Sequence, residues 1–480
     1  MNIKMVFSIL GRTLLIEAVL LLCPMLVSFI YGERSFADYL IPIAGLVAVG
    51  VPLSLLKVKD RSIYAKEGFV TVALVWILLS LVGAVPFVLS GALPSYADAL
   101  FETISGFTTT GATVVQNVEG LSHSLLFWRA FTHWIGGMGV LVFVLAILPG
   151  YNAGIMHVFR AESPGPSAQK LVSKLTFTAR ILYGIYVLLT VLEMIFLLCG
   201  KMGVFDSITH AFSTAGTGGF GIKNDSLAYY NSTYLEMVIA VFMFLFGINF
   251  NLFYLLLIRN FKKALKSEEF IVYLVMVVLA TLAIAVNILS LCAGFGQAIR
   301  YSFFQVTSIT STTGFSSVDF NEWPAFSKAI LVMLTCIGAC GGSTGGGMKV
   351  SRVIILFKSA MSNIKRMLHP RAVVTTKFEG EPLSKDTERG VYTYFILWTV
   401  ILVACTLLLC LDVNDFLTNF TATLACLGNV GPGLNLVGPL SNYALYSAPA
   451  KILLSFVMLV GRLEIFPMLI MLAPRTWQRG

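Results

Sequence analysis

Long apolar runs recur along the whole chain and are separated by short polar segments. A helix needs about 20 apolar residues to cross the roughly 30 Å hydrocarbon core of a bilayer. The runs that reach this length predict ten membrane spans, at residues 9–31, 38–57, 68–90, 124–149, 176–200, 232–258, 270–293, 325–358 (interrupted), 392–411 and 447–474. The pattern therefore predicts an all-α polytopic membrane protein.

Four further apolar segments are too short to cross. They lie between the spans, at residues 95–108, 204–215, 297–310 and 414–427, and each runs into glycines and then a polar loop. Short apolar helices of this kind are typical of re-entrant segments. We therefore expect four helices that enter the membrane and turn back.

The composition agrees with a membrane protein. Hydrophobic residues make up 57% of the 480 residues and charged residues 12%, against roughly 45–50% and about 25% in soluble domains. This shortage of charge excludes an ordinary soluble enzyme, a disordered chain and a nucleic-acid binder with a basic surface. The eight cysteines form no CxxC pair, so we interpret them as small buried hydrophobic residues and not as metal ligands.

The excess of basic residues, +9 in net charge, is distributed unevenly. With ten spans, the basic clusters at Lys57–Lys66, Arg160–Lys174, Arg259–Lys266 and Arg352–Arg389 all fall on one side, together with both termini. Loops rich in Lys and Arg stay in the cytoplasm. We therefore expect cytoplasmic termini, and re-entrant segments that dip in from outside. The N-terminal run is expected to remain as a span because Glu17 interrupts it and no small-residue cleavage site follows.

The four short segments end in related sequences, which indicates internal repetition. These are Thr109-Thr110-Gly111-Ala112, Thr217-Gly218-Gly219-Phe220, Thr312-Thr313-Gly314-Phe315 and Asn429-Val430-Gly431-Pro432, whose glycines lie 108, 95 and 117 residues apart. Each occurs in a unit of span, short helix, glycine loop and span. Two full spans per unit give every copy the same orientation, so four parallel copies can surround one axis.

Such an axis suits a dehydrated monovalent cation, which needs a ring of oxygens in place of its water. Backbone carbonyls supply these oxygens without a full charge that would trap the ion, and glycine reaches the required backbone angles at little steric cost. Short helices that enter from outside also aim their negative ends at the membrane centre. The predicted cation-binding residues are Thr109, Thr110, Gly111, Thr217, Gly218, Gly219, Thr312, Thr313, Gly314, Asn429, Val430 and Gly431.

The chain resembles the TrkH/TrkG/KtrB superfamily of potassium transport subunits, and is closest to its TrkH branch. The resemblance covers essentially the whole chain. It is carried by Phe101–Ala112, Trp134–Gly139, Gly341–Lys349 and Gly428–Gly433.

The resemblance implies four parallel M1–P–M2 repeats in a pseudo-fourfold pore, preceded by two extra N-terminal helices. The corresponding divisions are 1–65 for the two-helix unit and 66–160, 161–265, 266–390 and 391–480 for the repeats. It also implies a homodimer in which each protomer has its own pore. A cytoplasmic TrkA-type ring would hold the nucleotide, and this chain would need no cofactor of its own.

The same resemblance bears on which cation passes. Relatives that favour sodium commonly have serine at the first filter glycine, whereas Gly111 is glycine here, as are Gly219, Gly314 and Gly431. This pattern favours potassium. The second segment reads Thr-Gly-Gly-Phe and the fourth has Asn-Val in place of a Thr-rich lead. Both depart from the family pattern in side chains and not in the carbonyls.

A second glycine cluster interrupts the span at 325–358. Six glycines lie within the ten residues from Gly338 to Gly347, and each costs a helix about 1 kcal/mol relative to alanine. One interpretation is a hinge or a close-packing patch. The other, favoured by the resemblance, is an intramembrane gate below the filter, formed by Gly341, Gly342, Ser343, Thr344, Gly345, Gly346 and Gly347.

Two basic residues are expected at a depth in the membrane similar to that of this glycine cluster. An ionised side chain at the bilayer centre costs about 2.5–3.5 kcal/mol and marks a functional candidate. The resemblance implies that Arg462 stands beside the pore as a charge barrier to cations, and Lys349 could act similarly. The alternatives are an arginine that snorkels or pairs, and a lysine that anchors at the interface. We expect Glu102, Glu193 and Glu464 to be structural partners and not ion ligands.

The predicted function is gated, passive uptake of potassium across the cytoplasmic (inner) membrane. The alternative is a symporter that couples potassium entry to sodium or protons, but parallel repeats and the lack of an acidic residue at the filter favour the channel. A membrane enzyme would need a nucleophile–base set or a metal set, which the sequence does not indicate. The segment Val373–Leu383 predicts a short hairpin in a basic loop, either a docking site for the partner or an ordinary connector.

Overall fold

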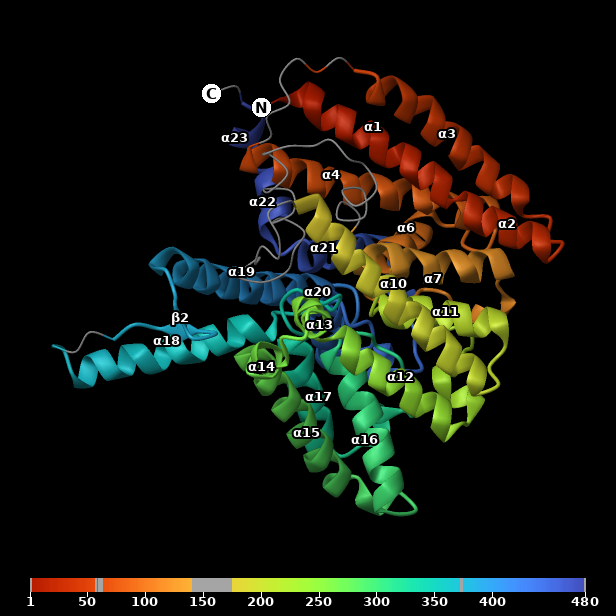
Figure 1. The fold of residues 1–480 in the computed structure, drawn as a ribbon. Helices are drawn as coiled ribbons and strands as arrows, with labels where there is room; N and C mark the ends of the chain where they lie inside the picture. The colour runs from red at the N-terminus through yellow and green to blue at the C-terminus, as the bar shows by residue number, and fades with distance from the viewer. Residues whose placement is uncertain (1, 57, 59–63, 140–174, 372–373, 479–480) are drawn as a thin grey trace.

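The computed structural model describes residues 2–56, 58, 64–139, 175–371 and 374–478, and these fold almost wholly into helices (Figure 1). The helices are α1 (Ile3–Leu20), α2 (Leu22–Ile30), α3 (Phe36–Ser54), α4 (Ala65–Gly83), α5 (Val85–Leu89), α6 (Tyr96–Phe107), α7 (His123–Gly137), α10 (Leu175–Cys199), α11 (Val204–Ala215), α12 (Thr233–Phe246), α13 (Phe250–Leu257), α14 (Phe261–Leu265), α15 (Glu268–Asn287), α16 (Phe295–Thr310), α17 (Ala325–Ile337), α18 (Val350–Leu368), α19 (Lys385–Leu409), α20 (Phe416–Gly428), α21 (Ala448–Arg462), α22 (Phe466–Leu472) and α23 (Pro474–Trp477).

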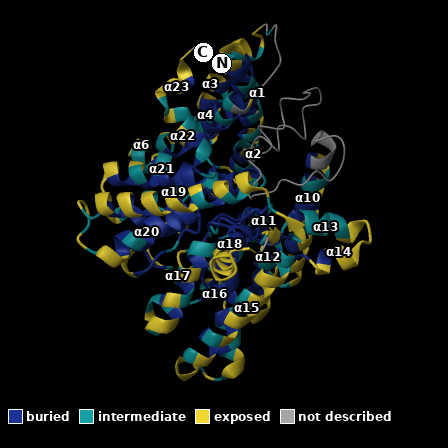
Figure 2. Cartoon of the chain, turned by 90° about the vertical axis from the view of Figure 1, so that its left-hand side faces the viewer, coloured by how far each residue is buried: buried dark blue, intermediate teal, exposed yellow. Residues whose placement is uncertain are grey.

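Among the described residues, six helical stretches are long and apolar enough to cross a membrane: Ile3–Ile30, Phe36–Ser54, Lys66–Leu89, Ala179–Cys199, Glu268–Asn287 and Lys385–Leu409. Their outward faces carry large apolar side chains, such as Leu279 on α15 and Leu407 on α19, each more than 60% exposed. Buried residues fill the middle of the molecule, and exposed residues lie on the outer helices (Figure 2). Apolar faces of this extent need lipid around them, so the chain is a multi-pass membrane protein.

Two of the ten predicted spans are wrong as continuous helices. The segment 232–258 forms α12 and α13, which meet at 91°, and the segment 447–474 forms α21 and α22, separated by Leu463–Ile465. The predicted interruption at 325–358 is confirmed, since α17 ends at Ile337 and α18 begins at Val350. In 124–149, α7 ends at Gly137. Residues 140–149, the basic cluster Arg160–Lys174 and the second division boundary, at 160, lie outside the described residues.

The four predicted re-entrant segments are helices α6, α11, α16 and α20, of 12, 12, 16 and 13 residues. These are too short to cross a bilayer. Their last turns are buried, whereas their first residues reach the surface. Asp415 caps the start of α20, where its carboxylate accepts a 3.2 Å hydrogen bond from the Thr418 amide. The hydrogen bond from the Thr418 hydroxyl lowers the pKa of Asp415 most, and the hydrogen bond from the Asn435 side chain lowers it further.

Strands β1 (Lys377–Phe378) and β2 (Glu381–Pro382) form an antiparallel hairpin. The short hairpin predicted for Val373–Leu383 is therefore confirmed, apart from residue 373, which lies outside the described residues. Its turn residues Glu379 and Gly380 both have positive φ, at 51° and 83°. The hairpin lies beside α18, and Lys358 of that helix donates a 3.1 Å hydrogen bond to the Lys377 carbonyl.

Candidate cation-binding site

The four segments that follow α6, α11, α16 and α20 share one backbone conformation. We call residues 109–111, 217–219, 312–314 and 429–431 the glycine segments. In each, the first residue has a left-handed φ, which is uncommon for residues other than glycine, and the third is a glycine with positive φ. The values are 54°, 55°, 62° and 53° for Thr109, Thr217, Thr312 and Asn429, and 80°, 76°, 84° and 96° for Gly111, Gly219, Gly314 and Gly431.

Each segment is also fixed to its helix in the same way. The middle residue of the segment donates its amide hydrogen to a carbonyl in the last turn of the helix, and the preceding left-handed residue closes a helix end of the Schellman type. The four hydrogen bonds are Thr110 to Ser105 (2.9 Å), Gly218 to Ser213, Thr313 to Ser308 and Val430 to Ala425 (2.8 Å each). The four helix ends therefore present their partial negative charge in equivalent positions.

The glycine segments contact one another in a closed cycle. A Cβ atom built on the glycine of any segment would overlap the middle carbonyl oxygen of the next. The overlapping pairs are Gly111 with Gly218, Gly219 with Thr313, Gly314 with Val430, and Gly431 with Thr110. A Cβ at Gly111 would also lie 3.7 Å from the Thr313 oxygen, across the ring. The twelve residues predicted from the sequence are thus brought together, with four carbonyl groups around one centre.

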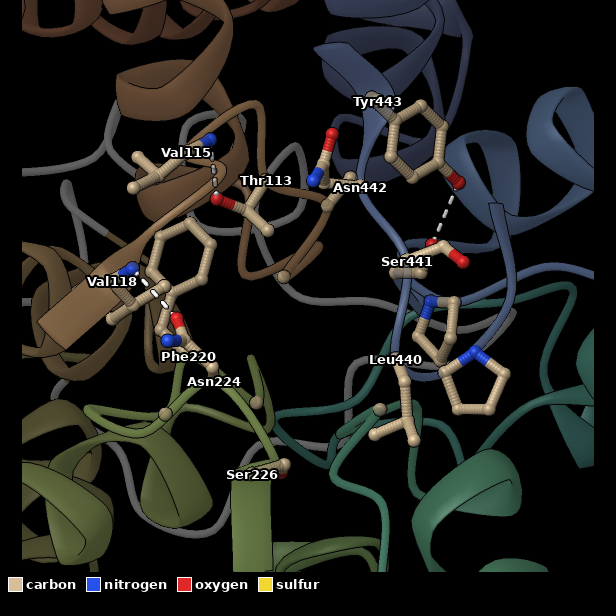
Figure 3. A pocket seen from close by; sticks show the side chains of 18 of the residues that line it. Thr113, Val115, Val118, Phe220, Asn224, Ser226, Leu440, Ser441, Asn442 and Tyr443 are labelled. Atoms are coloured by element: carbon tan, nitrogen blue, oxygen red, sulfur yellow. Dashed lines mark hydrogen bonds between the residues drawn. The ribbon is translucent and has the colours of Figure 1, made fainter. Parts of the chain in front are cut away.

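A cavity of about 130 Å³ opens on the glycine side of this ring. Its floor is made by Gly111, Gly219, Gly314 and Gly431. Its walls come from the loops that follow the segments, including Thr113–Val118 and Leu440–Tyr443 (Figure 3). The charged residues that line it are Arg129 and Lys223, and Lys223 lies 3.9 Å from the Glu119 carboxylate. The oxygen atoms that this lining offers to a cation are therefore those of carbonyl and hydroxyl groups.

A buried ion pair links the helix before the first segment to the loop after the second. Arg129 of α7 donates from Nε to Oε1 of Glu102 at 2.8 Å, and the side chains are 2% and 0% exposed. Glu102 also accepts from the Val114 amide at 3.0 Å. Arg129 reaches the loop after the second segment through a 3.2 Å hydrogen bond to the Gly221 carbonyl and lies over the Phe220 ring at 4.1 Å. The expectation that Glu102 is a structural partner is confirmed.

The fourth and first segments are joined by different side chains. Tyr443 donates its hydroxyl to the Gly431 carbonyl at 2.7 Å, and its amide to the Thr113 carbonyl at 2.8 Å. Asn429 donates to the Thr110 hydroxyl at 2.9 Å. The sequence analysis missed Arg129 and Tyr443. A single arginine within the apolar run of α7 was a usable signal for the first, whereas the loop around Tyr443 offers none.

The glycine loop, residues 338–349, lies on the opposite side of the ring from the cavity. The Gly346 amide donates to the Thr312 hydroxyl at 2.6 Å. A Cβ on Gly345 would come within 2.7 Å of the Ser311 carbonyl, and one on Gly346 within 2.5 Å of the Gly428 carbonyl. The loop is thus packed directly against the ends of α16 and α20.

The loop is held from the side by the bend between α12 and α13. The Cys340 amide donates to the Gly247 carbonyl at 3.1 Å, and the Phe250 amide donates to the Gly342 carbonyl at 3.0 Å. The Thr344 hydroxyl donates to the Phe246 carbonyl at 3.2 Å. These bonds satisfy backbone groups that the break in the helix would otherwise leave unpaired.

Both predicted barrier residues bind this loop. Arg462, the last residue of α21, donates to the Thr344 carbonyl at 2.8 Å and to the Gly137 carbonyl of α7 at 2.8 Å. Lys349 is 2% exposed and donates to the Gly345 carbonyl, so it is held inside the loop and not at a surface. Glu464 accepts a 2.5 Å hydrogen bond from Arg352, which confirms the expectation of a structural role. Glu193 is buried on α10, and its role stays a prediction.

Known proteins match this chain over almost its whole length. The family model TrkH, described as cation transport protein, matches residues 41–479. The chain is 34% identical to the Trk system potassium uptake protein TrkH of Escherichia coli strain K12, over 100% of both chains. It is 31% identical to TrkG of the same strain, over 99% of both.

A solved structure also matches over the whole length of the chain. The crystal structure of the potassium transporter TrkH from Vibrio parahaemolyticus superimposes with a TM-score of 0.88 at 32% identity, and 100% of both chains is covered. These are membrane transport proteins and not members of an enzyme family. The chain therefore belongs to the TrkH family of cation transport proteins.

Proposed function

We propose that this chain is the membrane subunit of a Trk-type system, and that potassium passes through it passively along the axis of the glycine segments. The observation that carries the proposal is the closed cycle of the segments, in which the glycine of each abuts the middle carbonyl of the next. Potassium uptake is also what its full-length relatives are named for.

The chemistry of the ring suits potassium. Four sets of backbone carbonyls replace the hydration shell of the ion while adding no full charge, so the ion can both enter and leave. The negative ends of four short helices favour a cation at the same depth. The glycines at positions 111, 219, 314 and 431 keep the ring free of side chains, which supports selection of potassium over sodium.

In this proposal the chain consists of four M1–P–M2 repeats at 66–160, 161–265, 266–390 and 391–480, with a two-helix unit at 1–65 before them. The equivalent helix ends and the matching φ values support the assignment of α6, α11, α16 and α20 as the four P helices. The closed order of contacts from first to fourth segment and back supports a single pseudo-fourfold pore.

The glycine loop is the proposed gate, with Arg462 and Lys349 as the charges that raise a barrier to cations. The loop fills the exit side of the ring, and the hydrogen bond from Arg462 to Thr344 supports a closed arrangement. A barrier of this kind must move before ions flow.

The remaining elements of the proposal concern the cell. We assign the chain to the cytoplasmic membrane, with both termini inside. The starts of α1 and α4 lie together with α23. The Asn2 amide donates a hydrogen bond to the Glu67 carboxylate at 3.2 Å, and the Lys66 ammonium donates one to the Arg475 carbonyl at 3.3 Å. We expect a homodimer, bound by a TrkA-type ring that docks at the β1–β2 hairpin and moves the gate.

The test is rubidium-tracer uptake into proteoliposomes that hold the purified protein alone, with protein-free liposomes as the control. We expect uptake that follows the imposed voltage, needs no sodium or proton gradient, and is reduced far more by potassium than by sodium. Uptake that stops without a sodium or proton gradient would contradict passive conduction. Equal competition by the two ions would contradict the carbonyl filter.

A further inference from the structure

The turn of the β1–β2 hairpin holds a residue that the turn itself does not favour. Glu379 and Gly380 have φ of 51° and 83°, the sign required at both central positions of a type I′ turn, where Asn-Gly or Asp-Gly is preferred. A left-handed glutamate costs conformational energy that asparagine would largely avoid. Residues held in such conformations often serve a function of the side chain.

The Glu379 carboxylate binds the first turn of α15. Its Oε1 accepts from the Ser267 hydroxyl at 2.8 Å and from the Glu269 amide at 3.1 Å, and its Oε2 accepts from the Glu268 amide at 3.2 Å. In return, the Glu379 amide donates to Glu268 Oε2 at 3.3 Å. The hairpin thus satisfies amides that a helix start leaves unpaired, and places a negative charge at the positive end of the helix.

The same turn of α15 binds both the glycine loop and the helix that follows it. The Glu269 side chain, 5% exposed, accepts at Oε1 from the Gly341 amide at 2.7 Å and from the Ser351 amide at 3.1 Å. Gly341 lies within the loop, and Ser351 lies in the first turn of α18, which follows the loop. Glu269 therefore binds the loop through its side chain and the hairpin through its backbone.

We propose that Glu379 and Glu269 form a latch that couples the hairpin to the glycine loop, so that lifting the hairpin frees the loop. This rests on the proposed function, because it deepens how that gate is regulated. When Glu379 leaves, the first turn of α15 loses the acceptors of its Glu268 and Glu269 amides. The Glu269 side chain then no longer holds the Gly341 and Ser351 amides at a fixed distance from each other. A partner that binds the hairpin can act on the gate in this way without touching the loop.

The latch is tested with Glu379→Asn. Asparagine suits the left-handed turn, but its shorter side chain cannot span to α15, so turn stability and latching are separated. The matched control is Glu381→Gln, which removes an exposed carboxylate two residues away on β2. Hydrogen–deuterium exchange of the purified protein is measured in peptides that cover residues 338–351, with peptides over 105–112 as the fold control. Rubidium-tracer uptake is measured in parallel.

Charged-group hydrogen bonds of this kind predict about tenfold faster exchange at 338–351 for Glu379→Asn. Tracer uptake should rise several-fold, with unchanged exchange at 105–112 and unchanged competition by potassium over sodium. Glu381→Gln should match the wild type in every measurement. Faster uptake without faster exchange at 338–351 would overturn the latch, as would wild-type exchange in the Glu379→Asn protein.

Glu269 provides a second pair of variants. Glu269→Gln keeps the acceptor oxygen and should stay near wild type, whereas Glu269→Ala should give the fast exchange of Glu379→Asn. The double variant Glu379→Asn/Glu269→Ala should exchange no faster than Glu269→Ala alone, because both changes break one linkage. Additive effects would overturn the coupling. The exchange readout tests the latch even if the wild-type protein fails to conduct potassium, so failure of the latch and failure of the proposed function are distinguishable.

Discussion

Arg462 donates a 2.8 Å hydrogen bond to the backbone carbonyl of Thr344. The two residues belong to different quarters of the chain, 118 positions apart. The same guanidinium donates to the carbonyls of Gly136 and Gly137 at the end of α7, at 2.5 and 2.8 Å. Arg462, at the end of α21, therefore ties the glycine loop to the end of α7.

Replacing Arg462 should open the gate. Arg462→Gln removes the positive charge and most of the donors that hold Thr344, and hydrogen bonds to charged groups are worth about 1.5–3 kcal/mol each. We expect basal rubidium uptake to rise about tenfold or more, since about 1.4 kcal/mol is a factor of ten in the gating equilibrium. The control is Arg475→Gln, an exposed arginine on α23. Equal uptake by the two variants would contradict the barrier role.

Shortening the loop should have a similar effect by another route. Deletion of Gly345–Gly347 removes the residues that pack against Ser311, Thr312 and Gly428. We expect tracer uptake to increase while potassium still competes better than sodium, because the glycine segments are left intact. Unchanged uptake in a folded deletion protein would show that the loop does not limit the flux.

The ring should be intolerant of side chains. In Gly111→Ser the new side chain would push the Gly218 carbonyl out of the ring and strain a φ of 80°. We expect a loss of at least several-fold in the preference of potassium over sodium, measured by competition against rubidium uptake. Gly91→Ser is the control: its φ is 74°, but nothing lies within 4 Å of a Cβ there. If both serine variants lose selectivity alike, backbone strain and not crowding of the carbonyl is the cause.

Removing only one member of the buried Arg129–Glu102 pair should destabilise the protein. Arg129→Met leaves the Glu102 carboxylate buried without its cation, and such losses cost about 3–5 kcal/mol. We expect a clear drop in the thermal unfolding temperature of the purified protein and weaker potassium preference. Lys223→Met at the looser pair with Glu119 should change stability by less than about 1 kcal/mol. Similar unfolding temperatures for the two variants would contradict a stabilising role for the Arg129–Glu102 pair.

Much of the molecule follows from local pattern. The lengths of apolar runs predicted the spans that became α3, α4, α15 and α19, and distinguished them from the short helices α6, α11, α16 and α20. The glycine segments could also be located from local sequence. A backbone with positive φ favours glycine, and it does so at positions only two or three residues apart. Hydropathy and backbone preference are local properties, so the sequence by itself determined them.

Other features exist only through contacts between distant positions. Residues 232–258 are mostly apolar and were predicted as one span, and their mean hydropathy does not reveal the 91° bend; the bend is stabilised by Cys340 and Gly342, which bind at Gly247 and Phe250. The cyclic order of the carbonyls, the pair of Arg129 with Glu102, and the meeting of Glu379 with Glu269 were likewise decided by tertiary structure. A buried polar group needs a partner, but its sequence neighbours do not say which one: the free energy of the whole packed arrangement selects it.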